Sequence, residues 1–263
     1  MAPSTIITLD SVFGESGRDD DKTCFRMPRF LCALTNGNLC ISDTMNQRLQ
    51  IVQPDGTFVK TIGAVGTGPG MLRGPSGVVC DGSCLYVCEA GNHRVQKLKL
   101  GMGGKNKSEP GSPLAGSPAS GAEPVATGEA AAAISWKEAA AAAVAAAAGG
   151  PPMGDAASET KADGAPLGRA GHHGAQKPTD LWCPQGICIS KRFSTEVKEL
   201  FVADSINGRV AVYDAGSMEH IRTFGERGEG EGQLLYPSGI AAPLEEVFVA
   251  ELGNHRVSVF SKK

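Results

Sequence analysis

The sequence predicts an all-β repeat protein, and three observations lead to that prediction. The phrase EAGNHRVQ (residues 89–96) returns as ELGNHRVS (residues 251–258), and looser copies read DTMNQRLQ (residues 43–50) and DSINGRVA (residues 204–211). Around each copy, short apolar runs alternate with polar turns, as the strands of a small sheet do. The copies recur at intervals of 46, 115 and 47 residues. A period in the forties is typical of one small sheet per repeat, so the long central interval must contain an insertion.

Each copy follows the same order of expected strands, beginning at a proline. The starting prolines are Pro28, Pro75, Pro184 and Pro237. One apolar run follows the proline, a second ends in an acid, and a third alternating run follows the Asn turn. Copies one and three add a fourth run, TFVKTIG and HIRTFG, whereas copy two is expected to lack one because the insertion occupies its place. Four short antiparallel strands per repeat make the blade of a β-propeller, so we expect a propeller of four four-stranded blades.

The two ends of the chain are expected to meet. Copy four stops after its third strand at Phe260, and residues 6–17 (IITLDSVFGESG) have the form of a fourth strand followed by glycines. Pairing these segments would close the ring and remove an exposed strand edge. An open arc, or a part of a larger propeller, is the alternative.

The repeated phrase supplies the same side chains to each turn between the second and third strands. Asn tolerates left-handed backbone conformations and suits a tight reversal. The flanking acid and Arg are placed to form a charge-assisted hydrogen bond that holds the hairpin or attaches it to a neighbouring blade. We interpret these residues as structural, because a residue needed once per blade recurs, whereas a catalytic group usually does not. They are Asp43, Asn46, Arg48, Glu89, Asn92, Arg94, Asp204, Asn207, Arg209, Glu251, Asn254 and Arg256.

The stretch PSGVVCDGSCLYVCEAGNHRVQ (residues 75–96) resembles an NHL repeat. The Asn-His-Arg triplet is intact in copies two and four, while copies one and three are looser, with Gln47 and Gly208 at the His position. The resemblance covers the chain outside the insertion and the extreme ends, and it implies a β-propeller. The family commonly builds six blades, so four copies are a departure from it.

A segment of different composition interrupts the repeats. Between residues 101 and 180, 23 Ala, 14 Gly and 8 Pro make up 45 of 80 residues. Such a segment cannot bury enough apolar area to offset its ordering entropy. We expect a disordered insertion that separates two propeller portions, residues 1–100 and 181–263. One short helix is expected inside it, over about residues 136–148, where SWKE forms a capping box before an alanine run.

Composition and cysteine spacing indicate in which cell compartment the protein functions and which kinds of site it can form. The net charge of −3 gives no global attraction to nucleic acid or membrane. No basic leader and no run of 18 apolar residues is present, so we expect an intracellular, cytoplasmic protein without a membrane segment. The eight cysteines include no CxxC pair and lie mostly in strand-like runs, so we interpret them as buried thiols. We expect neither a metal nor a cofactor.

The face that carries the Asn turns and the glycine-rich loops is the expected contact surface. The candidate binding residues on it are Gln47, His93, Arg227 and His255. The resemblance implies a non-catalytic scaffold that recognises a protein partner or substrate, sometimes within ubiquitin-ligase pathways, although this chain has no RING-like Cys/His spacing. The sequence leaves the oligomeric state open.

Two other functions stay open at this level. RNA binding, which some similar propellers show, requires a basic face, yet the loop at residues 225–232 holds three Glu and one Arg. A metal-dependent lyase or hydrolase of the propeller type would draw on His93, His255, Tyr86 and Tyr236. No HExxH or GxSxG motif accompanies them, and a histidine inside a repeated turn is more typical of structure than of catalysis. We therefore expect no catalytic residues.

Overall fold

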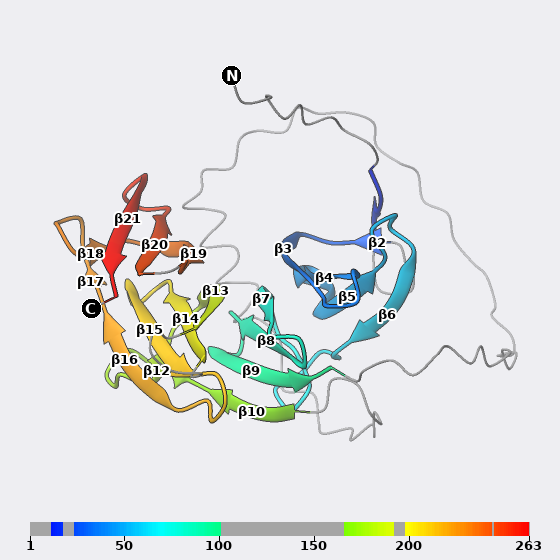
Figure 1. Ribbon diagram of the computed structural model, residues 1–263, viewed down its shortest axis with the longest axis horizontal. Helices are drawn as coiled ribbons and strands as arrows, with labels where there is room; N and C mark the ends of the chain where they lie inside the picture. Colours follow the sequence, from blue (N-terminus) through cyan, green and yellow to red (C-terminus); the bar gives the residue numbers. More distant parts are fainter. Residues whose placement is uncertain (1–11, 18–23, 101–165, 192–197, 244, 263) are drawn as a thin grey trace, which may run out of the picture.

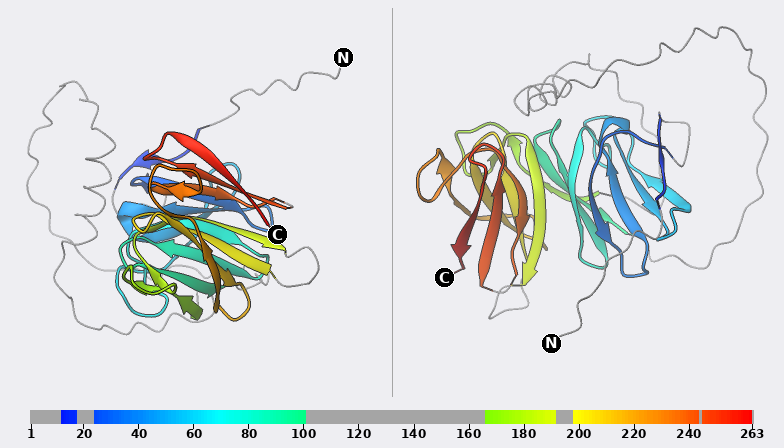
Figure 2. Two further views of the ribbon diagram at one scale, coloured as in Figure 1. Left: turned by 90° about the vertical axis from the view of Figure 1, so that its left-hand side faces the viewer. Right: turned by 90° about the horizontal axis from the view of Figure 1, so that it is seen from above.

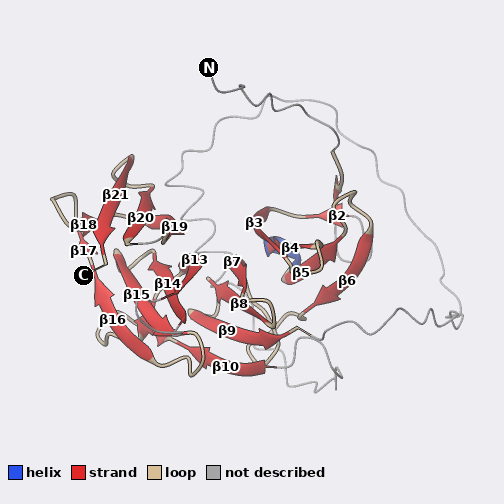
Figure 3. Cartoon of the chain, viewed as in Figure 1, coloured by secondary structure: helices blue, strands red, loops and turns tan. Residues whose placement is uncertain are grey.

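The four repeats fold as four small antiparallel sheets, blades 1 to 4, which follow one another along an arc (Figures 1 and 3). The structure, a computed structural model, describes residues 12–17, 24–100, 166–191, 198–243 and 245–262. Within these ranges one 3-10 turn, η1 (Thr44–Asn46), is the sole helical element, and no helix there could reach across a membrane. The predicted all-β class and the propeller-type blades are confirmed.

Blades 1 and 3 contain the four strands that the sequence predicts. Blade 1 consists of β3 (Pro28–Ala33), β4 (Leu39–Asp43), β5 (Arg48–Val52) and β6 (Phe58–Ile62). Blade 3 consists of β13 (Pro184–Lys191), β14 (Lys198–Asp204), β15 (Arg209–Asp214) and β16 (His220–Phe224). Each strand pairs antiparallel with the next, and the register places the acid of the second strand opposite the Arg of the third.

Blade 2 also has four strands, so the expectation that it lacks a fourth is wrong. It consists of β7 (Pro75–Cys80), β8 (Cys84–Glu89), β9 (Arg94–Lys99) and β10 (Pro166–Ala170). β10 pairs antiparallel with β9, with Ala170 opposite Val95. The insertion therefore separates the third and fourth strands of one blade. Residues 166–180, assigned to the disordered segment by composition, belong to the propeller instead, while residues 101–165, including the expected helix, lie outside the described residues.

Blade 4 has three strands, β19 (Pro237–Ala241), β20 (Glu246–Glu251) and β21 (Arg256–Ser261). The expected pairing of residues 6–17 with β21 is not made by the described part of that segment. β1 (Glu15–Ser16) pairs in parallel with β2 (Cys24–Phe25) beside blade 1, and residues 6–11 lie outside the described residues. Blades 1 and 4 therefore stand at the two ends of the arc (Figure 2).

The blades pack face to face, with the first strands on the inside of the arc and the fourth strands on its outside (Figure 1). We call the face that a blade turns to the following blade its trailing face, and the opposite one its leading face. Between blades 1 and 2, Leu49 and Ile51 of the trailing face meet Leu85, Val87 and Leu98 of the leading face. Equivalent apolar layers fill the other two junctions. Because both faces of the inner blades are covered, their second strands are nearly continuous apolar runs.

The connection that leads into each blade folds back on itself through a short parallel pairing. These pairings are β1 with β2, Val65 with Leu72, β11 (His172–His173) with β12 (Asp180–Leu181), and β17 (Glu226–Arg227) with β18 (Gln233–Leu234). We call these four connections the incoming loops. They all lie on the face of the arc that carries the Asn turns.

Candidate functional site

A buried acid lies at the centre of the same polar cluster in all four blades. Each acid is paired with the Arg five residues later through the Arg Nε, at 2.8 Å for Asp43, 2.7 Å for Glu89, 2.8 Å for Asp204 and 2.9 Å for Glu251. The carboxylate side chains are fully buried in every copy. The charge-assisted hydrogen bond expected from the sequence is therefore present four times. We call the acid, the Asn and the Arg of one blade its hairpin cluster.

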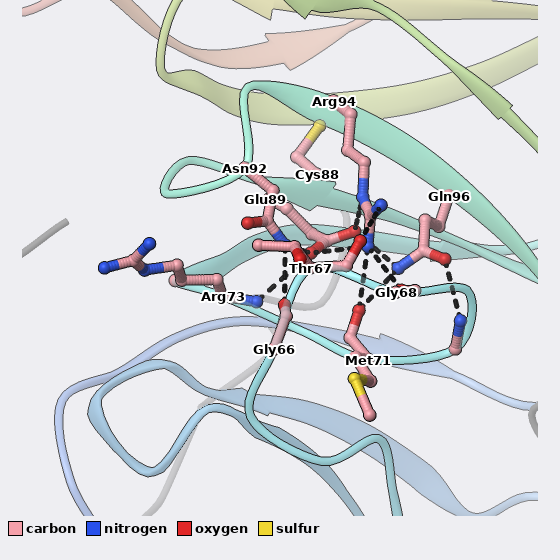
Figure 4. A network of polar contacts seen from close by, with 12 residues as sticks. Gly66, Thr67, Gly68, Met71, Arg73, Cys88, Glu89, Asn92, Arg94 and Gln96 are labelled. Atoms are coloured by element: carbon pink, nitrogen blue, oxygen red, sulfur yellow. Dashed lines mark hydrogen bonds and ion pairs between the residues drawn. The ribbon is translucent and has the colours of Figure 1, made fainter. Parts of the chain in front are cut away.

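The Asn of each hairpin cluster joins the acid to the incoming loop of its own blade. In blade 2, shown in Figure 4, the Nδ2 of Asn92 donates to Glu89 Oε2 at 2.5 Å and to the carbonyl of Gly66 at 2.9 Å. The other three copies repeat this pair of bonds, with Gly17, Gly174 and Gly228 as the loop acceptors. The Asn thus fixes the loop as well as its own turn.

The Arg side chain supplies most of the bonds to the incoming loop. Arg94 donates to the carbonyls of Thr67, Gly68 and Met71 at 2.6 to 3.0 Å (Figure 4). Arg256 donates in the same way to Glu229, Gly230 and Gln233. A planar guanidinium with five donors can satisfy several carbonyls and a carboxylate at once. The Arg therefore replaces water as the partner of a loop that has little regular pairing of its own.

The acid also accepts a backbone N–H from the residue two positions before the blade's starting proline. The donors are Arg26, Arg73, Trp182 and Leu235, at 2.7, 3.1, 2.7 and 2.9 Å. Each acid therefore holds the first strand, the turn and the incoming loop of its blade together. Every polar contact of the cluster described so far is internal, which fits the structural interpretation of these residues.

The environment of the acid differs along the arc. Burial raises the pKa of the Glu89 and Asp204 carboxyls, against the hydrogen bonds from Arg94 and from Trp182 N–H and Arg209 that favour the charged form. In blade 4, burial raises the pKa of Glu251 less than hydrogen bonds from Ser258 and Arg256 lower it, so its pKa lies below the usual value. Desolvation therefore outweighs the hydrogen bonds in setting the pKa of Glu89 and Asp204, and the hydrogen bonds outweigh desolvation in setting the pKa of Glu251.

One group of cluster residues was missed by the sequence interpretation. The residue seven positions after the acid adds a further hydrogen bond in three blades, and these residues are Gln50, Gln96 and Ser258. Gln96 also donates to the carbonyl of Met71 and accepts from the N–H of Gly70, so it holds the incoming loop as well. The sequence signal that could have identified these residues was a polar side chain two positions after the Arg, between apolar neighbours of the third strand. Blade 3 has Ala211 there, which hid the repeat.

Two of the four candidate binding residues contact the next blade rather than open surface. Gln47 and His93 occupy the left-handed position of the turn, with φ of 58° and 52°. The Oε1 of Gln47 accepts the N–H of Gly74, and the Nδ1 of His93 accepts the N–H of Cys183 at 3.1 Å. Both acceptors thus bind the residue just before the next blade's starting proline. Burial lowers the pKa of His93 to about 4, which keeps the ring neutral and able to accept.

The other two candidates lie on exposed parts of the same face. Arg227 donates to the carbonyl of Ile206 and to the hydroxyl of Tyr236, and its guanidinium lies 5.3 Å from the centre of that ring. His255 is exposed at the turn of blade 4. At the corresponding position of blade 3, Gly208 is required, because a Cβ there would lie 2.6 Å from the carbonyl oxygen of Leu234.

An aromatic group lies beside the junction of blades 2 and 3. The ring of His173 stacks at 4.2 Å on that of His93 and lies edge-on, at 5.5 Å, to that of Trp182. Trp182 is 37 % exposed, which is unusual for so large an apolar side chain. An open hollow of about 870 Å³ adjoins it, lined by the incoming loop over residues 172–182. Sequence reasoning missed this group because its residues were assigned to the insertion.

The cysteines and the metal-binding side chains give no further centre within the residues that can be described. All eight cysteines lie in the described ranges and none of them forms a disulfide; five are buried and three half-buried. Over the described ranges, no three His, Cys, Asp or Glu side chains lie in an arrangement that could hold a metal ion.

The fold and the hairpin clusters define a protein of β-propeller type whose blades are built from one repeated unit. A family model described as "NHL repeat" matches residues 25–52 and 234–260. These two stretches therefore match the NHL repeat, and the predicted resemblance is confirmed there. The matched stretches are copies one and four, so copy one, which looked looser by its turn triplet, is among them.

Known proteins are similar to this chain in sequence over a short stretch or in fold. The RING finger protein nhl-1 of Caenorhabditis elegans is 35 % identical over 68 residues, which is 26 % of this chain and 7 % of that protein. An auxiliary nutrient binding protein from Bacteroides thetaiotaomicron superimposes with a TM-score of 0.50 at 12 % identity, over 87 % of this chain and 46 % of that one. Hydrazine synthase of Kuenenia stuttgartiensis gives a TM-score of 0.49 at 14 % identity, over 92 % and 48 %. The chain thus spans about half the length of these solved structures, and the likeness concerns the fold alone.

Proposed function

We propose that this chain is a non-catalytic scaffold that recognises a protein partner through the face carrying its incoming loops. The observation that carries the proposal is that the Asn and Arg side chains of a hairpin cluster hydrogen-bond to the backbone of every described incoming loop. A loop held in one conformation loses little entropy on binding, so its exposed side chains can serve as a preorganised contact surface. The match to NHL repeats and the partial likeness to a RING-finger NHL protein support a role in recognition, with any link to ubiquitin ligation being indirect.

The side chains available on this face are of the types that dominate protein interfaces. Trp182 with His173, and Arg227 with Tyr236, each present an aromatic surface next to a donor group. Trp, Tyr and Arg are the residues most often found at interface hot spots. The neighbouring Glu226, Glu229 and Glu231 give the loop before blade 4 an acidic character, which favours a protein partner with basic groups over RNA.

Affinity capture with matched variants tests this function. The full chain, W182A and R227A would each be used as bait in an extract of its own cells, with and without ribonuclease, and V59D would serve as the control on the outer strand β6. We expect a protein that is retained by the full chain and by V59D, is reduced at least about tenfold by W182A or R227A, and does not respond to ribonuclease. Retention that ribonuclease abolishes would instead favour RNA, and retention unaffected by both variants would exclude this face.

A further inference from the structure

The trailing face of blade 4 exposes apolar side chains that every other blade buries. On β21, Val257 is 61 % and Val259 54 % exposed. In the other blades, the apolar residues at these two strand positions are at most 1 % exposed. These residues are Leu49, Ile51, Val95, Val210 and Val212. All five are covered by the leading face of the following blade. The trailing face of blade 4 is thus built as one half of a blade junction.

The leading face of blade 1 is the complementary half. Leu31 on β3 is 62 % exposed, whereas its counterparts Val78 and Ile187 are 5 % and 8 % exposed within their junctions. Met27, just before the starting proline, is 54 % exposed. The arc therefore ends in one uncovered trailing face and in a leading face that is exposed at its inner edge, at Leu31 and Met27. On that same leading face, Ile41 and Val52 are only 7 % and 2 % exposed. By the repeat symmetry of the chain, these two faces fit each other as the three internal pairs do.

A polar contact crosses the first two junctions, and the ends of the arc hold residues at its two positions; at the third junction Gly208 occupies the acceptor position and supplies no side chain. Gln47 and His93 accept the N–H of Gly74 and Cys183, which have φ of 57° and 56°. His255, with φ of 53°, stands at the acceptor position of blade 4. Met27, with φ of 52°, stands at the donor position of blade 1. The backbone at both positions already has the conformation that the internal contacts use.

The end of an additional fourth strand already lies against blade 1. Gly14, with φ of 91°, matches Gly63, Gly171 and Gly225, each of which follows the fourth strand of a blade and has φ between 77° and 91°. Phe13 before it corresponds to Phe224, whose ring lies 4.9 Å from that of Phe260 in the next blade. Phe13 itself packs so closely on blade 1 that a side chain at Gly56 would collide with it. Blade 4, at the other end of the arc, has three strands within the described residues.

We propose that a second copy of this chain covers both faces in a head-to-tail arrangement. The trailing face of blade 4 of one copy packs on the leading face of blade 1 of the next. Val12 and Phe13 of that next copy lie beside β21, at the edge where the described residues form no fourth strand. Two such contacts close a ring of eight blades, which is within the range that propellers form. This proposal concerns assembly and does not rest on the proposed recognition function.

The mass of the full chain in solution tests the proposal. Sedimentation or light scattering over a range of concentrations is expected to show a dimer. V259D and L31D each place a carboxylate in one half of the contact, and each is expected to weaken dimerisation about 100-fold or more. V59D, the same change on the outer strand of blade 1, leaves the dimer intact. Far-UV circular dichroism checks that each variant is folded.

A mixture of the two variants distinguishes the head-to-tail contact from a symmetric one. In a mixture of V259D and L31D, one intact trailing face and one intact leading face remain, so the two chains form an open dimer although neither associates alone. If L31D alone still dimerises, the contact joins two trailing faces and the proposal is wrong. A full chain that remains monomeric at its highest soluble concentration also overturns it.

Discussion

Blades 3 and 4 are built from the same repeat, and they differ in whether another blade packs on the trailing face. Their third strands, RVAVYD and RVSVFS, have the same alternation, and each Arg pairs with the acid opposite. On β15, Val210 and Val212 are fully buried, whereas Val257 and Val259 on β21 are more than half exposed. The sequence of a strand therefore does not tell which of its faces is covered.

The same comparison holds for the polar clusters. In blade 2, which blade 3 follows, the side chain of Arg94 is 6 % exposed, and in blade 4 that of Arg256 is 35 % exposed, although both bind three loop carbonyls and an acid. The pKa of the acid is raised in the first case and lowered in the second. Ion pairs of the same geometry are thus expected to contribute differently to the free energy of unfolding, because different amounts of solvent surround them.

The largest difference is expected when the Arg is removed. R94M leaves Glu89 buried without its charged partner, so we expect a loss of about 3–5 kcal/mol in the free energy of unfolding. R256M in the more open cluster of blade 4 should cost only roughly 1 kcal/mol, because water can replace the lost donors. Urea denaturation at low protein concentration measures both. Equal losses would show that burial does not set the strength of the pair.

An intermediate difference is expected for the valines. V210A opens a space between blades 3 and 4 and removes two buried methyl groups, which we expect to cost about 2 kcal/mol. V257A changes a largely exposed side chain of the same strand position and should cost less than about 0.5 kcal/mol. Thermal unfolding of the two variants beside the full chain gives the comparison. A large loss for V257A in the monomer would contradict the exposed trailing face.

The effect that is smallest at neutral pH concerns His93, because it develops only as the pH falls. Burial holds the pKa of His93 near 4, below its usual value of 6.5. Between these two pH values the unfolded chain therefore binds a proton at His93 and the folded chain does not. The stability that His93 contributes is therefore complete above about pH 6.5 and is lost as the pH falls towards 4. H93Q, which copies the acceptor that Gln47 provides in blade 1, should remove this pH dependence while keeping the junction. The difference in unfolding free energy between the full chain and H93Q across that pH range is the readout.

Local chemistry accounts for what the sequence analysis predicted well. The Asn turn, the acid opposite the Arg and the starting proline lie within a few residues of one another, so their spacing alone places them in one hairpin. The strand β10 was missed for the opposite reason. Its sequence PLGRA has weak strand propensity and lies at the end of an alanine- and glycine-rich segment, and it becomes a strand because the open edge of β9 offers it hydrogen-bond partners.

The sequence by itself determined the repeat, the strands of each hairpin and the acid–Arg pair within it, because those contacts are made between residues close along the chain. The bonds from the same Arg and Asn side chains to the incoming loops join residues more than twenty positions apart, so they were decided by the tertiary structure. Only the tertiary structure decided that Gln47 and His93 contact the next blade, that the insertion interrupts a blade, and that the described ends of the chain leave the arc unclosed. These outcomes depend on which surfaces meet across the molecule. Identical side chains are buried or exposed according to whether another blade stands beside them.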